Sequence, residues 1–395
     1  MRNFTFKGLL LTAVFMLLGC LSIQAANDDL ITKQITINLD KAGTLPNKIA
    51  SSEMYKITNL KIIGEINGTD WNMIREMAGR DNRGYGTEGK LSVLDLSEAK
   101  IVKGGDSYYP GDNCYTSNDE IGEKAFTDCS RLTSLTLPVG ITSIGYDAFA
   151  YCSGLTSLTL PAGITSIGEY AFYGCSGLTS LNLPAGITSI DKYAFLDCSG
   201  LTSLTLPDGI TSIGSRAFYG CSGLTSLTLP AGITSIGDDT FYGCSGLTSL
   251  TIPDGVTKIG KYAFSNCSYL TSLTIPSSVN SLGEYAFKNC SSLQSVHVSW
   301  STPISAGKAF NKADVSKCTL YVPQGTEQDY FLADVWGDFG NIVEYDPTGI
   351  DKVTTSTDAK ELSRYSVNGQ RLATPTKGLN IVKYSDGSVK KVAVQ

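Results

Sequence analysis

The sequence predicts a β-rich solenoid, a right-handed superhelix of stacked 23-residue repeats with a cap at each end and a small β module after it. Two residue types recur with that period, which is typical of stacked repeats. The cysteines of the series are Cys129, Cys152, Cys175, Cys198, Cys221, Cys244, Cys267 and Cys290. The phenylalanines are Phe126, Phe149, Phe172, Phe195, Phe218, Phe241, Phe264, Phe287 and Phe310. Only 17% of residues are charged and 41 are glycine, a composition that suits short strands and turns.

One repeat, residues 221–241, shows how the unit is built. Leu224, Leu227 and Leu229 have the L-x-x-L-x-L spacing of a leucine-rich repeat, in which a short strand turns its leucines inward. Pro230 should end that strand, because proline has no N–H to donate to a neighbouring strand.

The second half of the repeat should return to the core. Ile233 and Ile236 are three residues apart, and Phe241 should pack from the outer side. Gly237 permits a tight corner before the phenylalanine. A lone repeat buries too little apolar surface to offset the entropy lost on ordering it, so only stacked repeats should fold. We expect the solenoid at residues 120–323, as eight regular repeats and a last strand.

Residues 26–119 are expected to form an N-terminal cap with two irregular strands and a loop. The strands are expected at 57–62 and 91–96, where the leucine pattern returns with longer connections.

Between them, residues 70–78 predict a short helix. Thr69 or Asp70 is the expected N-cap, since both side chains can accept a hydrogen bond from the first turn. Gly79 follows as a helix terminator.

Downstream, residues 320–323 predict the last strand of the solenoid. A C-terminal cap is expected at 324–346, where Trp336 and Phe339 should close the core.

The final segment, 347–395, lacks the repeat and predicts a small β module. Asn-Gly at 368–369 and Asp-Gly at 386–387 are typical hairpin turns. The strand-like runs 379–384 and 389–394 flank the second turn.

Residues 1–25 have the pattern of a signal peptide that is removed from the mature chain. Arg2 and Lys7 precede an apolar stretch at 8–21 that is short for a membrane span. The alternative is a lipid anchor on Cys20, because the residues before it resemble a lipobox. Either route predicts a secreted or cell-surface protein, associated with the outer membrane, whose mature chain has no transmembrane span.

The repeat landmarks Cys-Ser-x-Leu, Leu-Pro, Ile-Gly and Ala-Phe resemble the BspA-like leucine-rich repeats of surface proteins from host-associated anaerobic bacteria. The stretches 67–79, 94–101 and 336–344 are similar to the caps of that family. The resemblance covers about residues 30–345. It implies an adhesion or host-binding protein at the cell surface or in the medium, and it carries no catalytic residues.

The C-terminal module is similar to the sorting domain of type IX secretion cargo, on the stretches 365–372, 377–382 and 390–392. The chain ends in Ala-Val-Gln at 393–395 where a basic residue is usual, so an ordinary terminal β module is the alternative.

The cysteine series predicts buried thiols. Zinc sites need close pairs such as C-x-x-C, which this sequence lacks. Stacked strands lie about 4.8 Å apart, and a disulfide needs Cβ atoms about 3.5–4.5 Å apart. Cys114 and Cys318 are distant in sequence, and their pairing stays open. We expect no metal and no cofactor.

His297 is the single histidine of the chain and the one imidazole available to a catalytic Ser or Cys. It takes the strand position that Thr274 has one repeat earlier, and Val296 and Val298 beside it predict core. A solvated histidine at the edge of the array is therefore expected rather than a catalytic one.

Exposed strand positions predict two parallel columns of hydroxyl groups, a candidate binding surface because solenoids present such extended faces to their ligands. The columns include Ser134, Thr136, Ser157, Thr159, Ser203, Thr205, Ser226 and Thr228. The alternative is that near-identical repeats merely copy one solvent-facing sequence.

The repeat pattern departs from uniformity at its ends, where a local site is easier to build. The candidates there are Tyr108, Tyr109, Tyr115, His297 and Trp300. The tyrosines of the outer corners form a weaker candidate patch, at Tyr170, Tyr193, Tyr262 and Tyr285. The alternative is that they only shield the core.

The net charge of −6 argues against nucleic acid as a partner, because that polymer selects clustered Lys and Arg. The sequence therefore predicts an exported binding or adhesion protein, not an enzyme, that engages a host or matrix protein or glycoconjugate. The alternative is a structural spacer or surface coat without a dedicated ligand.

Overall fold

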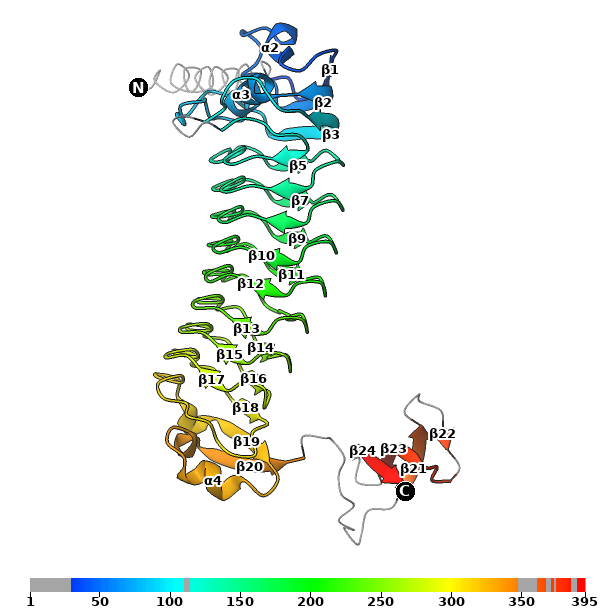
Figure 1. The fold of residues 1–395 in the computed structure, drawn as a ribbon, viewed down its shortest axis with the longest axis vertical. Coiled ribbons are helices and arrows are strands. Elements are labelled where there is room, and N and C mark those ends of the chain that lie inside the picture. Colours follow the sequence, from blue (N-terminus) through cyan, green and yellow to red (C-terminus); the bar gives the residue numbers. More distant parts are fainter. Residues whose placement is uncertain are drawn as a thin grey trace, which may run out of the picture.

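The computed structural model describes residues 30–109, 114–346, 361–366, 371–372, 374–384 and 389–394. The predicted signal peptide, with Cys20, lies outside these ranges. Figure 1 shows rungs stacked along the long axis, between a cap that carries helices α2 and α3 and a cap that carries α4. The predicted leucine-rich-repeat solenoid is confirmed, since strands one repeat apart in sequence pair in register.

Two parallel sheets run along one side of the solenoid. The first contains β1 (Ile35–Leu39), β2 (Asn59–Ile66), β3 (Val93–Ile101), β5 (Ser134–Thr136), β7 (Ser157–Thr159), β9 (Ser180–Asn182) and β11 (Ser203–Thr205). The second contains β14 (Ser249–Thr251), β16 (Ser272–Ile275), β18 (Ser295–Val298), β19 (Thr319–Pro323) and β20 (Asn341–Tyr345). We call the exposed side of these strands the strand face.

A second row of two-residue strands lies further along each rung. Its members are β4 (Glu120–Ile121), β6 (Ser143–Ile144), β8 (Ser166–Ile167), β10 (Ser189–Ile190) and β12 (Ser212–Ile213), then β13 (Ser235–Ile236), β15 (Lys258–Ile259) and β17 (Ser281–Leu282). After each of these strands the chain turns through the outer corner, the segment that carries the periodic phenylalanine and ends at the periodic cysteine.

The stack of strands is interrupted on both sides of the rung that carries Ser226, and we call this interruption the seam. After β11 the main ladder continues through a single bridge, Ser203–Ser226, and β14 starts the second sheet. The short strands divide only between β12 and β13, at the step from the rung of Ser203 to the rung of Ser226, and they pair regularly again from β13 to β15. The outer corner stays continuous there, with the rings of Phe218 and Phe241 5.4 Å apart. The sequence gives no sign of this seam, because the strand residues Ser-Leu-Thr are the same on both sides.

The nine periodic phenylalanines form one unbroken column, the phenylalanine stack. Centroids of neighbouring rings lie 5.2–5.6 Å apart, and their planes are within 16° of parallel. The leucines and isoleucines predicted to turn inward are buried with them, as in the rung of Leu224, Ile233 and Ile236. Because every rung contributes to the same columns, each one covers the apolar surface of its neighbour.

The N-terminal cap covers the first phenylalanine. Helix α3 (Gly68–Met77) carries Trp71, whose ring centroid lies 5.1 Å from that of Phe126. The Trp71 indole N–H donates to the Ala125 carbonyl at 2.9 Å. Helix α2 (Leu45–Lys48) packs beside α3. Strand β1 precedes the two strands that the sequence indicated, so the described part of this cap contains three.

The predicted N-cap of α3 is wrong. Asn67 is the N-cap, since its side chain accepts from the Thr69 N–H at 3.1 Å. Asp70 occupies the third helical position and accepts from the Asn67 N–H at 3.0 Å, which completes a capping box. The short polar side chain of Asp70 suits both positions, and only the fold of the preceding loop decides between them.

The C-terminal cap closes the other end of the stack. Phe310 packs edge-on against Trp336 and Phe339, with its ring centroid 5.7 Å from that of Trp336 and 5.6 Å from that of Phe339. Helix α4 (Glu327–Leu332) adds the buried Tyr330, whose hydroxyl donates to the Trp300 carbonyl at 2.9 Å. Two 3₁₀ turns, η1 (Val315–Lys317) and η2 (Trp336–Asp338), connect these elements.

The C-terminal segment forms a separate antiparallel sheet in the order β22 (Arg371–Leu372), β21 (Glu361–Ser366), β23 (Gly378–Tyr384) and β24 (Val389–Val394). The predicted strands near 379–384 and 389–394 are confirmed. The predicted turns at 368–369 and 386–387 lie outside the described residues. Arg364, buried in this sheet, is held by Glu361 at 2.7 Å.

Candidate functional site

The strand face presents the predicted hydroxyl columns. Ser134 pairs with Ser157, and Thr136 pairs with Thr159, so like residues stand side by side on consecutive rungs. All eight hydroxyl residues of the candidate surface are exposed, whereas the leucine between each pair is buried. Because the strand backbones bond to one another, the ladder does not depend on these exposed hydroxyl groups.

A third column borders the strand face and stitches the rungs together. Thr156 donates its hydroxyl to the Thr133 carbonyl at 3.2 Å, and Thr179 donates to the Thr156 carbonyl at 3.2 Å. The same contact recurs at Thr202 and Thr225. These threonines are structural, and the sequence did not separate them from the two outward columns.

A hollow interrupts the strand face at the seam. It holds about 440 Å³ and is lined by Ser226, Thr228, Ser249 and Thr251 with the apolar Leu229 below. Hydroxyl residues of two neighbouring rungs line it, at a step where the ladder of the main sheets does not continue.

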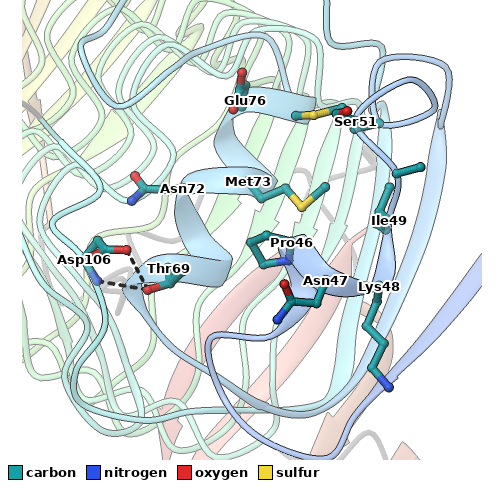
Figure 2. Close-up of a pocket in the computed structure, with 12 residues that line it drawn as sticks. Pro46, Asn47, Lys48, Ile49, Ser51, Thr69, Asn72, Met73, Glu76 and Asp106 are labelled. Carbon is teal, nitrogen blue, oxygen red and sulfur yellow. Dashed lines mark hydrogen bonds between the residues drawn. The ribbon is translucent and has the colours of Figure 1, made fainter.

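A second cleft lies in the N-terminal cap between α2 and α3, and Figure 2 shows its lining residues. It holds about 690 Å³. Its apolar part comes from Ile49, Met54 and Met73, and its rim carries Glu76 and Asp106. Flexible methionines beside acidic groups suit an apolar or cationic side chain of a partner.

The polar groups of this cap cleft are already positioned by neighbours. Thr69 donates its hydroxyl to Asp106 at 2.8 Å (Figure 2), and Glu76 accepts a hydrogen bond from the Tyr55 hydroxyl. That bond raises the pKa of Tyr55 to about 12. The sequence did not indicate the cleft, because it depends on how α2 folds back on α3.

The three tyrosines of the irregular loop have separate environments. Tyr108 is wrong as a surface candidate: it is 1% exposed and donates its hydroxyl to the Glu123 carbonyl at 2.9 Å, so it belongs to the core. Tyr109 is half-buried, with the Arg75 guanidinium 5.2 Å from its ring centroid. Tyr115 is 50% exposed.

Trp300 is also wrong as a surface candidate. It is 5% exposed, and its indole N–H donates to the Val279 carbonyl at 2.6 Å. The C-terminal cap covers it, with Trp336 5.7 Å away.

His297 lies on the strand face near the downstream cap, but it is more enclosed than a solvated edge residue. Its ring stacks on that of Tyr321, with the centroids 4.2 Å apart, and packs edge-on against that of Tyr345, with the centroids 5.7 Å apart. Burial by these rings lowers the pKa of His297 below its usual value. The sequence missed the cluster because β20, which carries Tyr345, was not predicted as a strand.

The periodic cysteines are buried and form no disulfide, as predicted. From Cys152 onward, each thiol donates to the carbonyl of the phenylalanine of the preceding rung, as Cys175 does to Phe149 at 3.1 Å. Burial raises the pKa of Cys175 and of Cys290 to about 12. Cys114 and Cys318 are buried at opposite ends of the array, so they do not pair with each other.

Within the described ranges, no group of three or more His, Cys, Asp or Glu side chains is placed to hold a metal ion. No helix in the same residues is long and apolar enough to cross a bilayer.

The outer corner carries a ridge of tyrosines. Tyr170 stacks on Tyr193 with centroids 4.5 Å apart, and Tyr262 stacks on Tyr285 at 5.0 Å. Between the two pairs the ridge is hollowed into a cleft of about 520 Å³ that includes Arg216.

Comparison with known proteins identifies a family that has this repeat architecture. The family model described as "BspA type Leucine rich repeat region (6 copies)" matches residues 119–230 and 211–327, more than half of the chain. The chain belongs to the BspA-type leucine-rich-repeat family. The curated proteins contain no match to it.

Several solved structures are similar to this BspA-type chain. The Treponema pallidum leucine-rich-repeat protein TpLRR is 27% identical, with a TM-score of 0.40, over 45% of this chain and 84% of that one. The pneumococcal vaccine antigen PcpA is 21% identical, with a TM-score of 0.43, over 73% and 80%. A leucine-rich cell surface protein from Faecalibacterium prausnitzii is 22% identical, with a TM-score of 0.38, over 78% and 82%.

Proposed function

We propose that this BspA-type protein is an exported binding protein that engages an extended macromolecule, a host or matrix protein or glycoconjugate, along its strand face. The observation that carries the proposal is the register of exposed hydroxyl groups, in which Ser134 and Thr136 of one rung align with Ser157 and Thr159 of the next. Each rung offers the same weak contact, and many rungs bound at once give a useful affinity.

The repetition supports an extended ligand over a compact one. A single tight site needs unlike residues that converge on one spot, and the middle rungs repeat the same pair. The seam hollow and the His297 cluster interrupt the face without ending it, because Ser272 and Ser295 continue the serine column beyond the seam.

Immobilised mucin, laminin and collagen serve as probes, with soluble protein lacking residues 1–25. The variant Thr159→Lys/Thr205→Lys places two long cations on the strand face, and Thr159→Ser/Thr205→Ser is the matched control. Binding to at least one probe that the lysine pair weakens and the serine pair preserves supports the proposal. If no probe binds, or if the lysine pair binds as well as the wild type, the spacer or coat function is favoured.

We infer that export ends in display at the cell surface or release into the medium, with the four-stranded C-terminal sheet as the sorting signal. Support comes from its resemblance to type IX cargo domains and from its formation as a sheet of its own. Intact-mass measurement of the natural secreted protein tests this: loss of the segment after about residue 346 is expected, and a retained C-terminus contradicts the inference. The same spectrum distinguishes cleavage after residue 25 from lipidation of Cys20.

A further inference from the structure

The outer corner contains two columns of residues with left-handed backbone. The first column is Lys124, Asp147, Tyr170, Tyr193, Arg216, Asp239, Tyr262 and Tyr285, with φ between 53° and 63°. The second column, four residues further along each rung, is Asp128, Tyr151, Gly174, Asp197, Gly220, Gly243, Asn266, Asn289 and Lys312. Both are imposed by the turn, since they occur whatever the residue.

The two columns meet the same backbone requirement with different residues. The second uses mostly Gly, Asn and Asp, which tolerate this conformation best. The first uses tyrosine at four rungs, although a bulky side chain is costly there. The fold therefore does not require these tyrosines, and their rings must contribute something that Asn or Gly would not.

Where the first column loses its tyrosines, a cleft opens. Tyr193 and Tyr262 stand at its two ends, three rungs apart, or about 14 Å at the usual strand spacing. Tyr219 and Tyr242 line it from the neighbouring position, stacked on each other at 4.5 Å with ring planes 7° apart. The cleft holds about 520 Å³, within the usual size of a small-ligand site.

A charged pair lies between the end tyrosines. The Arg216 guanidinium donates from Nε to Asp239 Oδ2 at 3.1 Å, and from a terminal nitrogen to the Tyr193 hydroxyl at 2.9 Å. Its other terminal nitrogen also lies 3.1 Å from Asp239. Arginine has five N–H donors, so this arrangement holds the side chain in place and leaves donors for a ligand beside the second Asp239 oxygen.

We propose that this cleft, lined by Tyr193, Arg216, Tyr219, Asp239, Tyr242 and Tyr262, binds a carbohydrate. Pyranose rings have an apolar C–H face that packs on a tyrosine ring, and an edge of hydroxyl groups that bonds to a fixed donor and acceptor. A peptide side chain would need aliphatic pockets, and Leu196 is the one aliphatic residue of the lining.

The charges of the cleft favour a carbohydrate over a nucleic acid, whose bases would also stack on tyrosine. Arg216 and Lys288 are opposed by Asp239 in the lining and by Asp197 beside Gly220. The site therefore lacks the cationic excess that a phosphate backbone selects. This proposal concerns the outer corner and does not depend on the strand-face function.

The test is binding of the intact folded protein to a printed array of neutral and acidic glycans, followed by saturation-transfer NMR with the best oligosaccharide. The wild type is expected to bind at least one glycan and to transfer saturation to its ring C–H protons. Tyr262→Asn, which suits the left-handed backbone, is expected to weaken binding by about tenfold or more, as is Arg216→Ala. Tyr193→Phe keeps the ring and should bind more strongly than Tyr193→Asn.

The matched control is Tyr151→Asn, in the second left-handed column and away from the cleft, which should bind like the wild type. Circular dichroism on each variant confirms that the solenoid is folded. The proposal is overturned if no glycan binds, if Tyr151→Asn weakens binding as much as Tyr262→Asn, or if an oligothymidylate binds and the glycans do not.

Discussion

The strand face and the outer corner belong to the same rungs, yet the residues of the strand face repeat from rung to rung whereas those of the outer corner change. On the strand face, Ser and Thr recur from rung to rung at exposed positions where packing would accept almost any polar residue. On the outer corner the first left-handed column changes from Asp147 to Tyr170 to Arg216, although its backbone favours a narrower set. Repetition suits a ligand that runs along the array, and variation suits a ligand that sits at one place.

The strand face and the outer corner cover the same core, in which the phenylalanine stack runs unbroken from rung to rung. The predicted consequence is that damage to the core removes both faces together, whereas damage to either face is local.

The largest effect is expected from Phe218→Ala, in the middle of the phenylalanine stack. Removing a fully buried ring should lower the free energy of unfolding by about 3–5 kcal/mol. Guanidinium unfolding followed by circular dichroism measures it. Tyr219→Ala, at the half-buried neighbouring position, is the control and should cost far less. Equal losses would mean that the corner tyrosines are core residues, and the contrast between the faces would fail.

Next in size is the effect of charge on the strand face. Thr159→Lys/Thr205→Lys should weaken binding to the responsive matrix probe by about tenfold, because cations displace the hydroxyl contacts of several rungs. Unfolding free energy should change by less than about 0.5 kcal/mol, since both sites are exposed. Glycan binding at the outer corner should not change. A loss at both sites would show that they are not independent.

The thiols under the outer corner predict a smaller effect that depends on pH. The pKa of Cys175 is raised by burial from 9.0 to about 12, so the folded state disfavours the thiolate. Stability that is complete below about pH 9 should therefore be lost as the pH rises towards 12. Cys175→Ala should reduce the loss measured between pH 8 and pH 10 by about 1 kcal/mol. An unchanged pH profile would contradict the burial of this thiol.

The smallest effect is expected at His297, where the strand face meets the cap. Burial lowers its pKa from the usual 6.5, so a little stability should be lost as the pH falls through that value. An NMR titration of the single histidine should give a midpoint below 6.5. Tyr321→Ala removes the stacked ring and should move the midpoint back up. A wild-type midpoint at or above 6.5 would place the histidine in solvent.

Much of the fold was predictable because the repeat is periodic. The spacing of Leu224, Leu227 and Leu229 indicates inward strand residues, and the recurrence of Phe and Cys indicates columns in the core. These features depend on local pattern and on stacking of like upon like, which a sequence displays directly.

The rest depended on contacts between unlike segments. Trp300 reads as an irregular surface residue until the C-terminal cap folds over it, and Tyr108 reads as a loop residue until its hydroxyl reaches the Glu123 carbonyl. The seam at Ser226 and the cleft at Arg216 were equally hidden, because their rungs carry the ordinary landmarks. No sequence pattern shows that the corner tyrosines have a positive φ. That backbone conformation is what makes tyrosine a costly residue at these positions rather than a neutral one.

The measurement that tests the strand-face account most directly is affinity against rung number. Deleting residues 154–176 removes one whole repeat and joins equivalent positions, and deleting 131–176 removes two. If the ligand binds along the strand face, affinity for the responsive matrix probe falls by a similar factor for each repeat removed, in variants that keep the circular dichroism of the folded array. Undiminished affinity after both deletions would contradict binding along the strand face and would reduce the repeats to a scaffold.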